Sequence, residues 1–270
     1  MTEGVFNCLI DEARTRVFRR AISNTIKKGD VVVDMGTGSG ILAMFAADAG
    51  AKKVYAIEND ENNFITLAET LKTNNYEDKI FLIKGDVRRV KLPEKVDVVI
   101  GEMISSGLIE EQQIPAMNNI LKFTKGNPRV LLSKYEIYLD LVYNREKYYG
   151  KKLPIIRYEY SDVKSTKSTP FSDKVKITEV NFKKVNKKNS ISKKVVLRIK
   201  KSGTINGIRI SSETTFSDGS RFSHSFAYSF PIILPIISQR VRNNEEYQVN
   251  INYILCGGFR TLKYSLTGVS

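Results

Sequence analysis

The sequence predicts an α/β domain with a parallel sheet, followed by a domain of antiparallel β-strands. In the first half, short β-branched runs alternate with helical patterns, an order typical of parallel sheets covered by helices on both faces. From Lys134 onward, alternating apolar segments separated by turn residues replace the helical pattern. Charge divides at the same place: residues 1–133 contain 18 basic and 18 acidic residues, whereas residues 134–270 contain 25 and 11. We therefore expect two domains, 1–133 with a helical N-terminal segment and 134–270.

The predicted strands of the first domain each end near an acidic residue. Apolar runs at 31–33, 53–57, 80–83 and 96–100 predict strands, and the patterns at 41–47, 62–73 and 114–123 predict helices. The acids that follow the strands are Asp34, Glu58, Asp86 and Glu102. Open α/β sheets bind ligands beyond the carboxyl ends of their strands, so these acids are expected to share one site. Taken singly, each could equally be a solvated loop residue.

The second domain is predicted to be a β-sandwich or a β-barrel. Strand-like alternation occupies 195–199, 204–210, 247–253 and 261–266, and turn signals lie at 218–219, 243–244 and 257–258. The stretch 174–201 contains 11 basic residues and a single acid, Glu179. This stretch is either a solvated, partly disordered loop or a surface that binds phosphate, as on RNA or a ribonucleoprotein.

Composition excludes several classes of protein. At 270 residues, 41% hydrophobic and 27% charged, the chain has an ordinary globular composition. Its longest apolar run, 230–237, is broken by Pro231 and Pro235 and falls short of the ~18 residues that span a bilayer, so no membrane partner is expected. The N-terminus lacks a secretion signal, and two distant cysteines, Cys8 and Cys256, suit a reducing compartment, so we expect a cytoplasmic location. One histidine and two distant cysteines supply no metal-ligand cluster.

The glycine cluster after the first strand indicates the kind of ligand. Gly36, Gly38 and Gly40 follow Asp34, the third glycine comes one residue sooner than in dinucleotide-binding loops, and the loop has no lysine. A carboxylate at Asp34 would repel phosphate but suits an amino group. Glu58, at the end of the second strand, is placed to accept both hydroxyls of a ribose. An amine and a ribose without pyrophosphate describe S-adenosyl-L-methionine (SAM).

The glycine cluster and its flanks resemble the cofactor site of class I SAM-dependent methyltransferases, in particular the protein arginine methyltransferases. The resemblance spans residues 11 to about 123 and implies a Rossmann-like cofactor domain followed by a β-barrel. Within it, segment 11–15 is similar to a family segment whose arginine, here Arg14, holds the carboxylate of the cofactor. Segment 84–87 is similar to one that borders the adenine, which implies that role for Asp86 and Val87.

The same resemblance implies a catalytic pair of glutamates. The family has two glutamates nine residues apart that flank the guanidinium of a target arginine, and Glu102 and Glu111 match that spacing. Two carboxylates suit a planar cation because they accept charge-assisted, bidentate hydrogen bonds. Glu111 could instead be an acid favoured by the dipole of the helix that follows. Where the family has tryptophan after the first glutamate, this chain has Met103, and it contains no tryptophan at all.

A third catalytic candidate is His224, the only histidine of the chain. Segment 223–225, Ser-His-Ser, is similar to a family Thr-His-Trp element whose histidine helps organise the site. A polar residue on a strand is an equally good interpretation. The family's ring-shaped dimer depends on a helical arm, and segment 154–171 is too short for a full arm, so we expect a monomer or a different dimer.

Three functions are open at this point. The first is methyl transfer from SAM to a protein side chain, arginine first, by in-line displacement. The second keeps the cofactor but makes RNA (rRNA or tRNA) the acceptor, with the basic second domain binding nucleic acid. The third is a non-catalytic RNA-binding or scaffold protein that keeps the cofactor fold, since the family's aromatic residues are missing.

Overall fold

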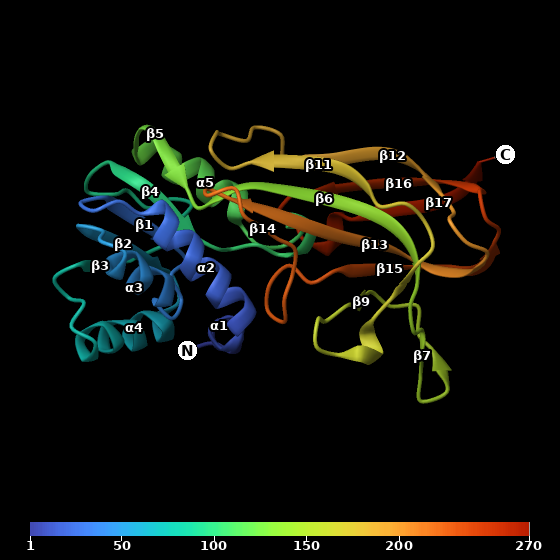
Figure 1. The fold of residues 1–270 in the computed structure, drawn as a ribbon, viewed down its shortest axis with the longest axis horizontal. Helices are drawn as coiled ribbons and strands as arrows, with labels where there is room; N and C mark the ends of the chain where they lie inside the picture. The colour runs from blue at the N-terminus through green and yellow to red at the C-terminus, as the bar shows by residue number, and fades with distance from the viewer. Residues whose placement is uncertain (270) are drawn as a thin grey trace.

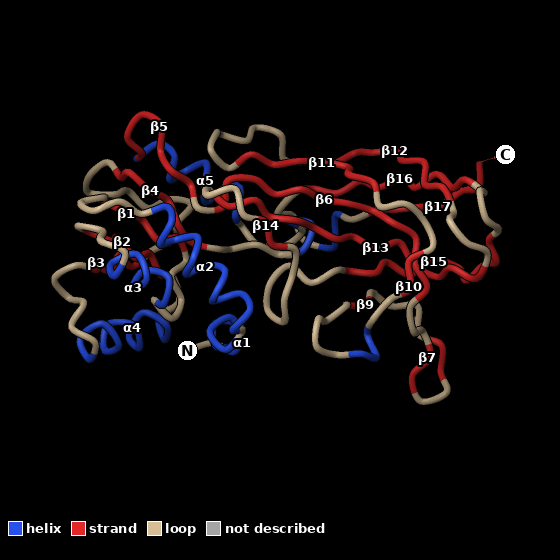
Figure 2. The backbone as a smooth tube through the Cα atoms, viewed as in Figure 1, coloured by secondary structure: helices blue, strands red, loops and turns tan. Residues whose placement is uncertain are grey.

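The computed structural model describes residues 1–269 and confirms the expected fold class. A five-stranded parallel sheet is followed by antiparallel sheets. Figures 1 and 2 show an elongated molecule in which the helices gather around the parallel sheet at one end, while strands and loops make up most of the rest. Among the described residues, no helix has both the length and the apolar character needed to cross a membrane.

The parallel sheet has the strand order β3-β2-β1-β4-β5. Two helices precede it, and the four predicted strands and the helices between them are all present. Helix 114–123 is shorter than predicted, because its last turn is a 3-10 helix at Leu121–Phe123. The elements are α1 (Glu3–Ile10), α2 (Glu12–Thr25), β1 (Val31–Met35), α3 (Ile41–Asp48), β2 (Lys53–Glu58), α4 (Glu61–Thr73), β3 (Ile80–Lys84), β4 (Val96–Gly101), α5 (Gln113–Ile120) and β5 (Thr124–Val130).

Strand β1 is central, and apart from Asp34 its residues are apolar on both faces. All five residues of Val31–Met35 are buried, and the strand pairs in parallel with β2 on one side and β4 on the other. A strand that helices cover on both faces gains from β-branched residues at successive positions rather than at alternate ones. The glycine cluster directly follows this strand, so it lies at the edge of the sheet where the predicted acids are.

Gly101 places the end of β4 against β1. Its φ is +110°, and a Cβ atom there would lie 2.5 Å from both the backbone nitrogen and the backbone oxygen of Met35. Backbone atoms of a central strand have no room to move aside. The next residue is Glu102, so this close approach also sets where that side chain leaves the sheet.

Gly101→Ala is expected to lower the free energy of unfolding by about 2–5 kcal/mol, from the strained φ together with the backbone collision. Gly29→Ala is the matched control, since Gly29 has a φ of +92° but nothing within 4 Å of the added Cβ. Its expected cost is the conformational one alone, about 1–2 kcal/mol. Urea unfolding of both variants measures the difference, and equal losses would contradict the role of the close approach.

The second half forms a seven-stranded and a three-stranded antiparallel sheet that share one hydrophobic core, and a separate β7–β8 hairpin. Strand β6 begins at Leu132 and crosses the predicted boundary at 133/134, so the domain limits stay a prediction. The elements are β6 (Leu132–Tyr143), β7 (Lys147–Tyr148), β8 (Lys151–Lys152), β9 (Arg157–Tyr158), β10 (Thr169–Pro170), β11 (Val175–Asn181), β12 (Ser190–Arg198), β13 (Gly203–Phe216), β14 (Arg221–Phe222), β15 (Ile232–Val241), β16 (Glu246–Ile254) and β17 (Lys263–Val269).

The basic stretch 174–201 is largely strand. It includes β11, which pairs with β6, and β12, which pairs with β16, and only the connection 182–189 between them is a long loop. Most of the stretch is thus built into the two sheets, and its basic side chains project from a folded surface.

Candidate active site

A cavity of about 760 Å³ lies beyond the carboxyl ends of the parallel strands. Its walls come from α1, the glycine loop after β1, the loop after β4, and segment 226–230 of the second half. Six of the predicted site residues line it together: Arg14, Gly36, Gly38, Glu58, Glu102 and Glu111. Five others lie outside its lining: Asp34, Gly40, Asp86, Val87 and His224.

The glycine loop is tied to the end of β2 through Glu58. The backbone N–H of Gly38, a residue with a φ of +56°, donates to Oε2 of Glu58 at 2.9 Å, and the N–H of Asp60 donates to Oε1 at 2.7 Å. These two bonds orient the carboxylate toward the cavity. Each oxygen keeps a further lone pair, so the oriented carboxylate has the capacity to accept two ligand hydroxyls.

Asp34 lies behind the glycine loop rather than in the cavity wall. The side chain is 1% exposed, and its Oδ2 accepts a hydrogen bond of 2.6 Å from the hydroxyl of Thr37. Its Oδ1 has no hydrogen-bond partner among the described residues. Burial raises the pKa of Asp34 to about 7. A buried carboxylate oxygen without a donor fits a ligand that brings a positive charge or an N–H group.

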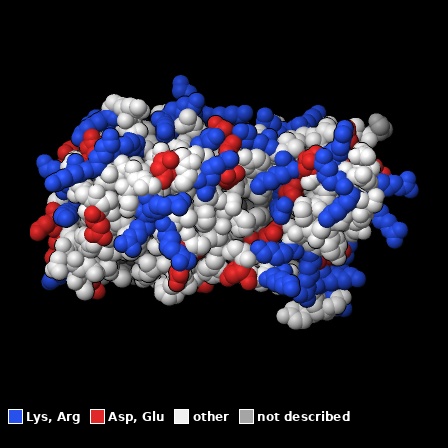
Figure 3. All heavy atoms as spheres, in the orientation of Figure 1, with Lys and Arg blue, Asp and Glu red and all other residues white. Residues whose placement is uncertain are grey.

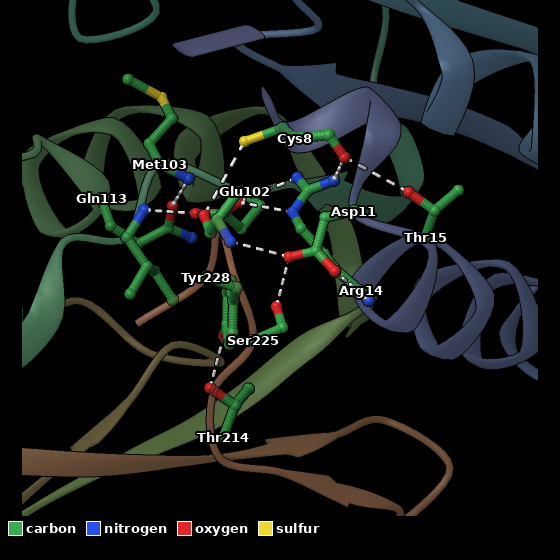
Figure 4. Close-up of polar contacts among 12 residues, drawn as sticks. Cys8, Asp11, Arg14, Thr15, Glu102, Met103, Gln113, Thr214, Ser225 and Tyr228 are labelled. Atoms are coloured by element: carbon green, nitrogen blue, oxygen red, sulfur yellow. Dashed lines mark hydrogen bonds and ion pairs between the residues drawn. The ribbon is translucent and has the colours of Figure 1, made fainter. Parts of the chain in front are cut away.

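Arg14 and Glu102 form a buried ion pair at the floor of the cavity (Figure 4). The Nη2 and Nε of Arg14 lie 2.9 and 3.2 Å from Oε2 of Glu102, and both side chains are at most 6% exposed. Oε1 of Glu102 accepts from the N–H of Ile104 at 2.6 Å. The guanidinium also lies over the ring of Phe18, 4.8 Å from its centroid. These contacts fix the carboxylate of Glu102 in one orientation.

Asp11 connects this ion pair to the second half of the chain. Its Oδ1 accepts from the N–H of Arg14 at 3.0 Å and so caps α2, while its Oδ2 accepts from the hydroxyl of Ser225 at 2.5 Å and the N–H of Ala227 at 2.8 Å. Figure 4 shows Asp11 between α2 and the segment that carries Ser225 and Tyr228. Sequence reasoning assigned no role to Asp11 or Ser225. An acid before a helix is a capping signal, whereas nothing local marked Ser225.

Glu111 faces the same cavity as Glu102 from the other end of the loop after β4. The hydroxyl of Ser105 accepts from the N–H groups of Glu110 and Glu111 at 2.8 and 3.1 Å, which curls this loop back on itself. Desolvation in the cavity, together with the nearby charges of Glu102 and Glu110, raises the pKa of Glu111 to about 7. The loop therefore presents two carboxyl groups in different electrostatic surroundings.

The two residues expected near an adenine have other partners. Asp86 is held by Arg88, whose Nη2 lies 2.6 Å from its Oδ2, and this hydrogen bond lowers the pKa of Asp86. Val87 is buried, and its carbonyl accepts from the side chain of Asn119 at 2.9 Å. Gly40 caps α3, and a Cβ there would lie 2.3 Å from Leu67. The φ of +77° favours glycine at position 40, and a larger residue there would also have to displace the end of the Leu67 side chain.

The structure does not bring His224 to the two glutamates. The charged groups around it are Glu159, Lys167, Lys174 and Arg209 of the second half, and burial lowers its pKa. The next residue, Ser225, is the one whose side chain reaches toward α2 and binds Asp11.

Aromatic side chains that sequence reasoning missed line the cavity. They are Tyr160, after β9, and Phe226 and Phe230, before β15. The rings of Tyr160 and Phe230 lie 5.1 Å apart between centroids, and Phe230 is anchored through its carbonyl, which accepts from the hydroxyl of Ser106. The cavity therefore has aromatic walls although the chain contains no tryptophan. Within residues 1–269, no group of three or more metal-ligating side chains occurs.

Comparison with known proteins defines the class. The TRM5/TYW2 methyltransferase domain family matches residues 12–122. The probable protein arginine N-methyltransferase 6.1 of Oryza sativa subsp. indica is 38% identical over 152 residues, which cover 54% of this chain and 40% of that protein. Together with the glycine loop and the acids that line the cavity, these matches identify the chain as a class I SAM-dependent methyltransferase that resembles the protein arginine methyltransferases.

The chain belongs to the same family as the uncharacterized protein MJ1452 of Methanocaldococcus jannaschii. The two are 32% identical over 263 residues, which cover 97% of this chain and 95% of the relative. The fold extends to a solved structure, the Trypanosoma brucei PRMT1 enzyme-prozyme heterotetrameric complex with AdoHcy, with a TM-score of 0.77, 18% identity, and coverage of 97% of this chain and 96% of that one. The two-domain architecture is therefore shared, whereas the chain spans less than half the length of the rice relative.

Proposed function

We propose that this methyltransferase transfers the methyl group of SAM to an arginine side chain of a protein. The observation that carries the proposal is that Glu102 and Glu111, from the two ends of one loop, line a single cavity together with Arg14 and the glycine loop. Two carboxylates beside a fixed guanidinium leave net negative charge for a second, incoming cation. The similarity to a probable protein arginine N-methyltransferase of rice agrees with such an acceptor.

The cofactor end of the cavity consists of residues whose free hydrogen-bonding capacity matches SAM. Bound SAM supplies an electrophilic methyl group on a positively charged sulfur. Glu58 has lone pairs for the ribose hydroxyls, and the unpartnered oxygen of Asp34 lies behind the loop where an amino group or a bridging water would bind. Arg14 has five N–H donors, of which the contacts to Glu102 and Cys8 use three, so the guanidinium keeps donors for a carboxylate.

At the acceptor end, Glu102 and Glu111 bind the planar guanidinium and aim one nitrogen at the methyl group. The fixed orientation of Glu102 is the important part, because positioning the reacting atoms supplies much of the rate enhancement in a transfer of this kind. The faces of Phe230 and Tyr160 suit the flat cation as well. We assign no step to His224, because it lies outside the cavity lining.

The raised pKa of Glu111 predicts a pH-dependent rate. Below its pKa of about 7 the carboxyl is mostly protonated and loses the charge that attracts a guanidinium, so kcat/KM for the acceptor at saturating SAM should rise with pH through about 7 and level off about one unit above it. Glu111→Gln should remove this titration. Asp34 titrates near the same pH, so the SAM affinity is measured over the same range to separate its effect. A profile that Glu111→Gln leaves unchanged would assign the titration to another group.

RNA remains a second candidate acceptor, and the excess of positive charge in the second half favours it. One experiment separates the two. The protein is incubated with methyl-labelled SAM and a cell extract, and the labelled product is treated with protease or ribonuclease. We expect protease to release the label and acid hydrolysis to yield methylated arginine. Label released by ribonuclease alone would replace the proposal with RNA methylation. A cytoplasmic location, and a monomer or a dimer unlike the ring, stay predictions.

A further inference from the structure

The positive charge of the second half is of two kinds. Some basic side chains form ion pairs, as in Arg209–Asp140, Arg221–Glu136 and Lys176–Glu136, of which the last two share one acid. Six lysines between β11 and the middle of β12 have no acidic partner within residues 1–269, and all six are exposed. We call these six residues the lysine patch: Lys183, Lys184, Lys187, Lys188, Lys193 and Lys194.

The loop that carries four of these lysines is anchored to the first half of the chain. Asn186 and Asn118, which lies on α5, exchange two hydrogen bonds: the N–H of Asn186 donates to Oδ1 of Asn118 at 2.8 Å, and Nδ2 of Asn118 donates to the carbonyl of Asn186 at 2.9 Å. Phe182, at the start of the loop, is fully buried. The backbone that carries the lysines on either side of Asn186 is therefore held in place, which lowers the entropic cost of using them together.

The patch lies along one edge of the molecule. Figure 3 shows basic side chains gathered along the upper edge, over the region where Figure 1 draws β11, β12 and the loop between them. Neither the active-site cavity nor the second large cavity, between Tyr143 and Ser238, borders the six lysines. Lys193 and Lys194 leave opposite faces of β12, which is an edge strand, and both are exposed. A partner would therefore meet exposed charges rather than a pocket for a side chain.

We propose that the lysine patch binds the phosphate backbone of single-stranded RNA without regard to base sequence. All six cations are lysines, which act as mobile point charges for phosphate, and no arginine is present to grip a carboxylate with two parallel hydrogen bonds. The lysines lie on an irregular loop and on a strand, so a flexible single strand can bring successive phosphates to them where a rigid duplex does not. The proposal goes beyond arginine methylation and does not depend on it.

The test is the salt dependence of RNA binding. A fluorescein-labelled 20-nucleotide oligouridylate is titrated with the full chain at several salt concentrations. If six phosphates are neutralised, log Kd should change with log salt with a slope of about 4, since each contact on a single strand contributes about 0.7. Replacing Lys183, Lys184, Lys187 and Lys188 by serine should reduce that slope by about 3 and weaken binding at low salt by about tenfold or more.

A matched control removes the same amount of charge elsewhere. Serine replaces four exposed lysines of the parallel-sheet half that have no ion pair in the described residues: Lys28, Lys52, Lys72 and Lys79. This variant should keep the wild-type slope. Equal losses in the two variants would reduce the effect to net charge and overturn the proposal, as would an absence of RNA binding. Polyglutamate or a DNA duplex that binds as tightly as the oligouridylate would overturn it in favour of an acidic protein or of DNA.

Discussion

Glu102→Gln is expected to lower the rate of methyl transfer by about 10²- to 10³-fold, the loss typical of removing one precisely oriented electrostatic group from an active site. The amide oxygen can still accept from Arg14, so the SAM affinity should stay near that of the wild type. The fold should lose some stability, because the buried Arg14 guanidinium loses its counter-charge and the N–H of Ile104 loses its acceptor. The loss of rate reflects the negative charge that orients and polarises the incoming guanidinium. Single-turnover methylation of an arginine-rich peptide, with SAM binding measured by calorimetry, separates the two effects.

Glu110→Gln serves as the control for this variant. Glu110 is adjacent to Glu111 in sequence and carries the same charge, but it does not line the cavity. Its replacement should change the rate by no more than a few fold. An active Glu102→Gln enzyme, or equal losses in the two variants, would contradict the proposed role of Glu102.

Arg14→Met is expected to damage both stability and activity. Breaking a buried ion pair leaves a carboxylate without its counter-charge, and such changes lower the free energy of unfolding by about 3–5 kcal/mol. Transfer should be lost together with tight SAM binding. Thermal unfolding and SAM titration measure the two losses independently.

The double variant Arg14→Met/Glu102→Met tests whether the loss of stability comes from the unpaired charge. Two apolar side chains leave no uncompensated charge, so much of the lost stability should return while methyl transfer stays absent. A double variant as unstable as Arg14→Met alone would show that Arg14 acts through packing, for example against Phe18, rather than through its charge.

Local patterns predicted much of the cofactor side. The run of valines, the glycine cluster and the acid at the end of β2 are each contiguous in sequence, and the parallel arrangement follows from the alternation of strands and helices. From these patterns, the same location beside the ligand was predicted for all four acids at the strand ends. The structure distinguishes them, since Glu58 and Glu102 line the cavity, Asp34 lies behind the glycine loop, and Asp86 is paired with Arg88.

The sequence by itself determined the class of fold and the edge of the sheet where the cavity lies, because both depend on patterns within short segments. The pair Glu102 and Glu111 was predicted from the resemblance to a family. Only the tertiary structure decided which part of the second half completes the site. Asp11 and Ser225 are 214 positions apart, and Phe230 reaches the cavity from the segment that leads into β15. Such contacts depend on how the two halves of the chain pack against each other. The hydrophobic periodicity within each half predicts its own helices and strands, but not this packing.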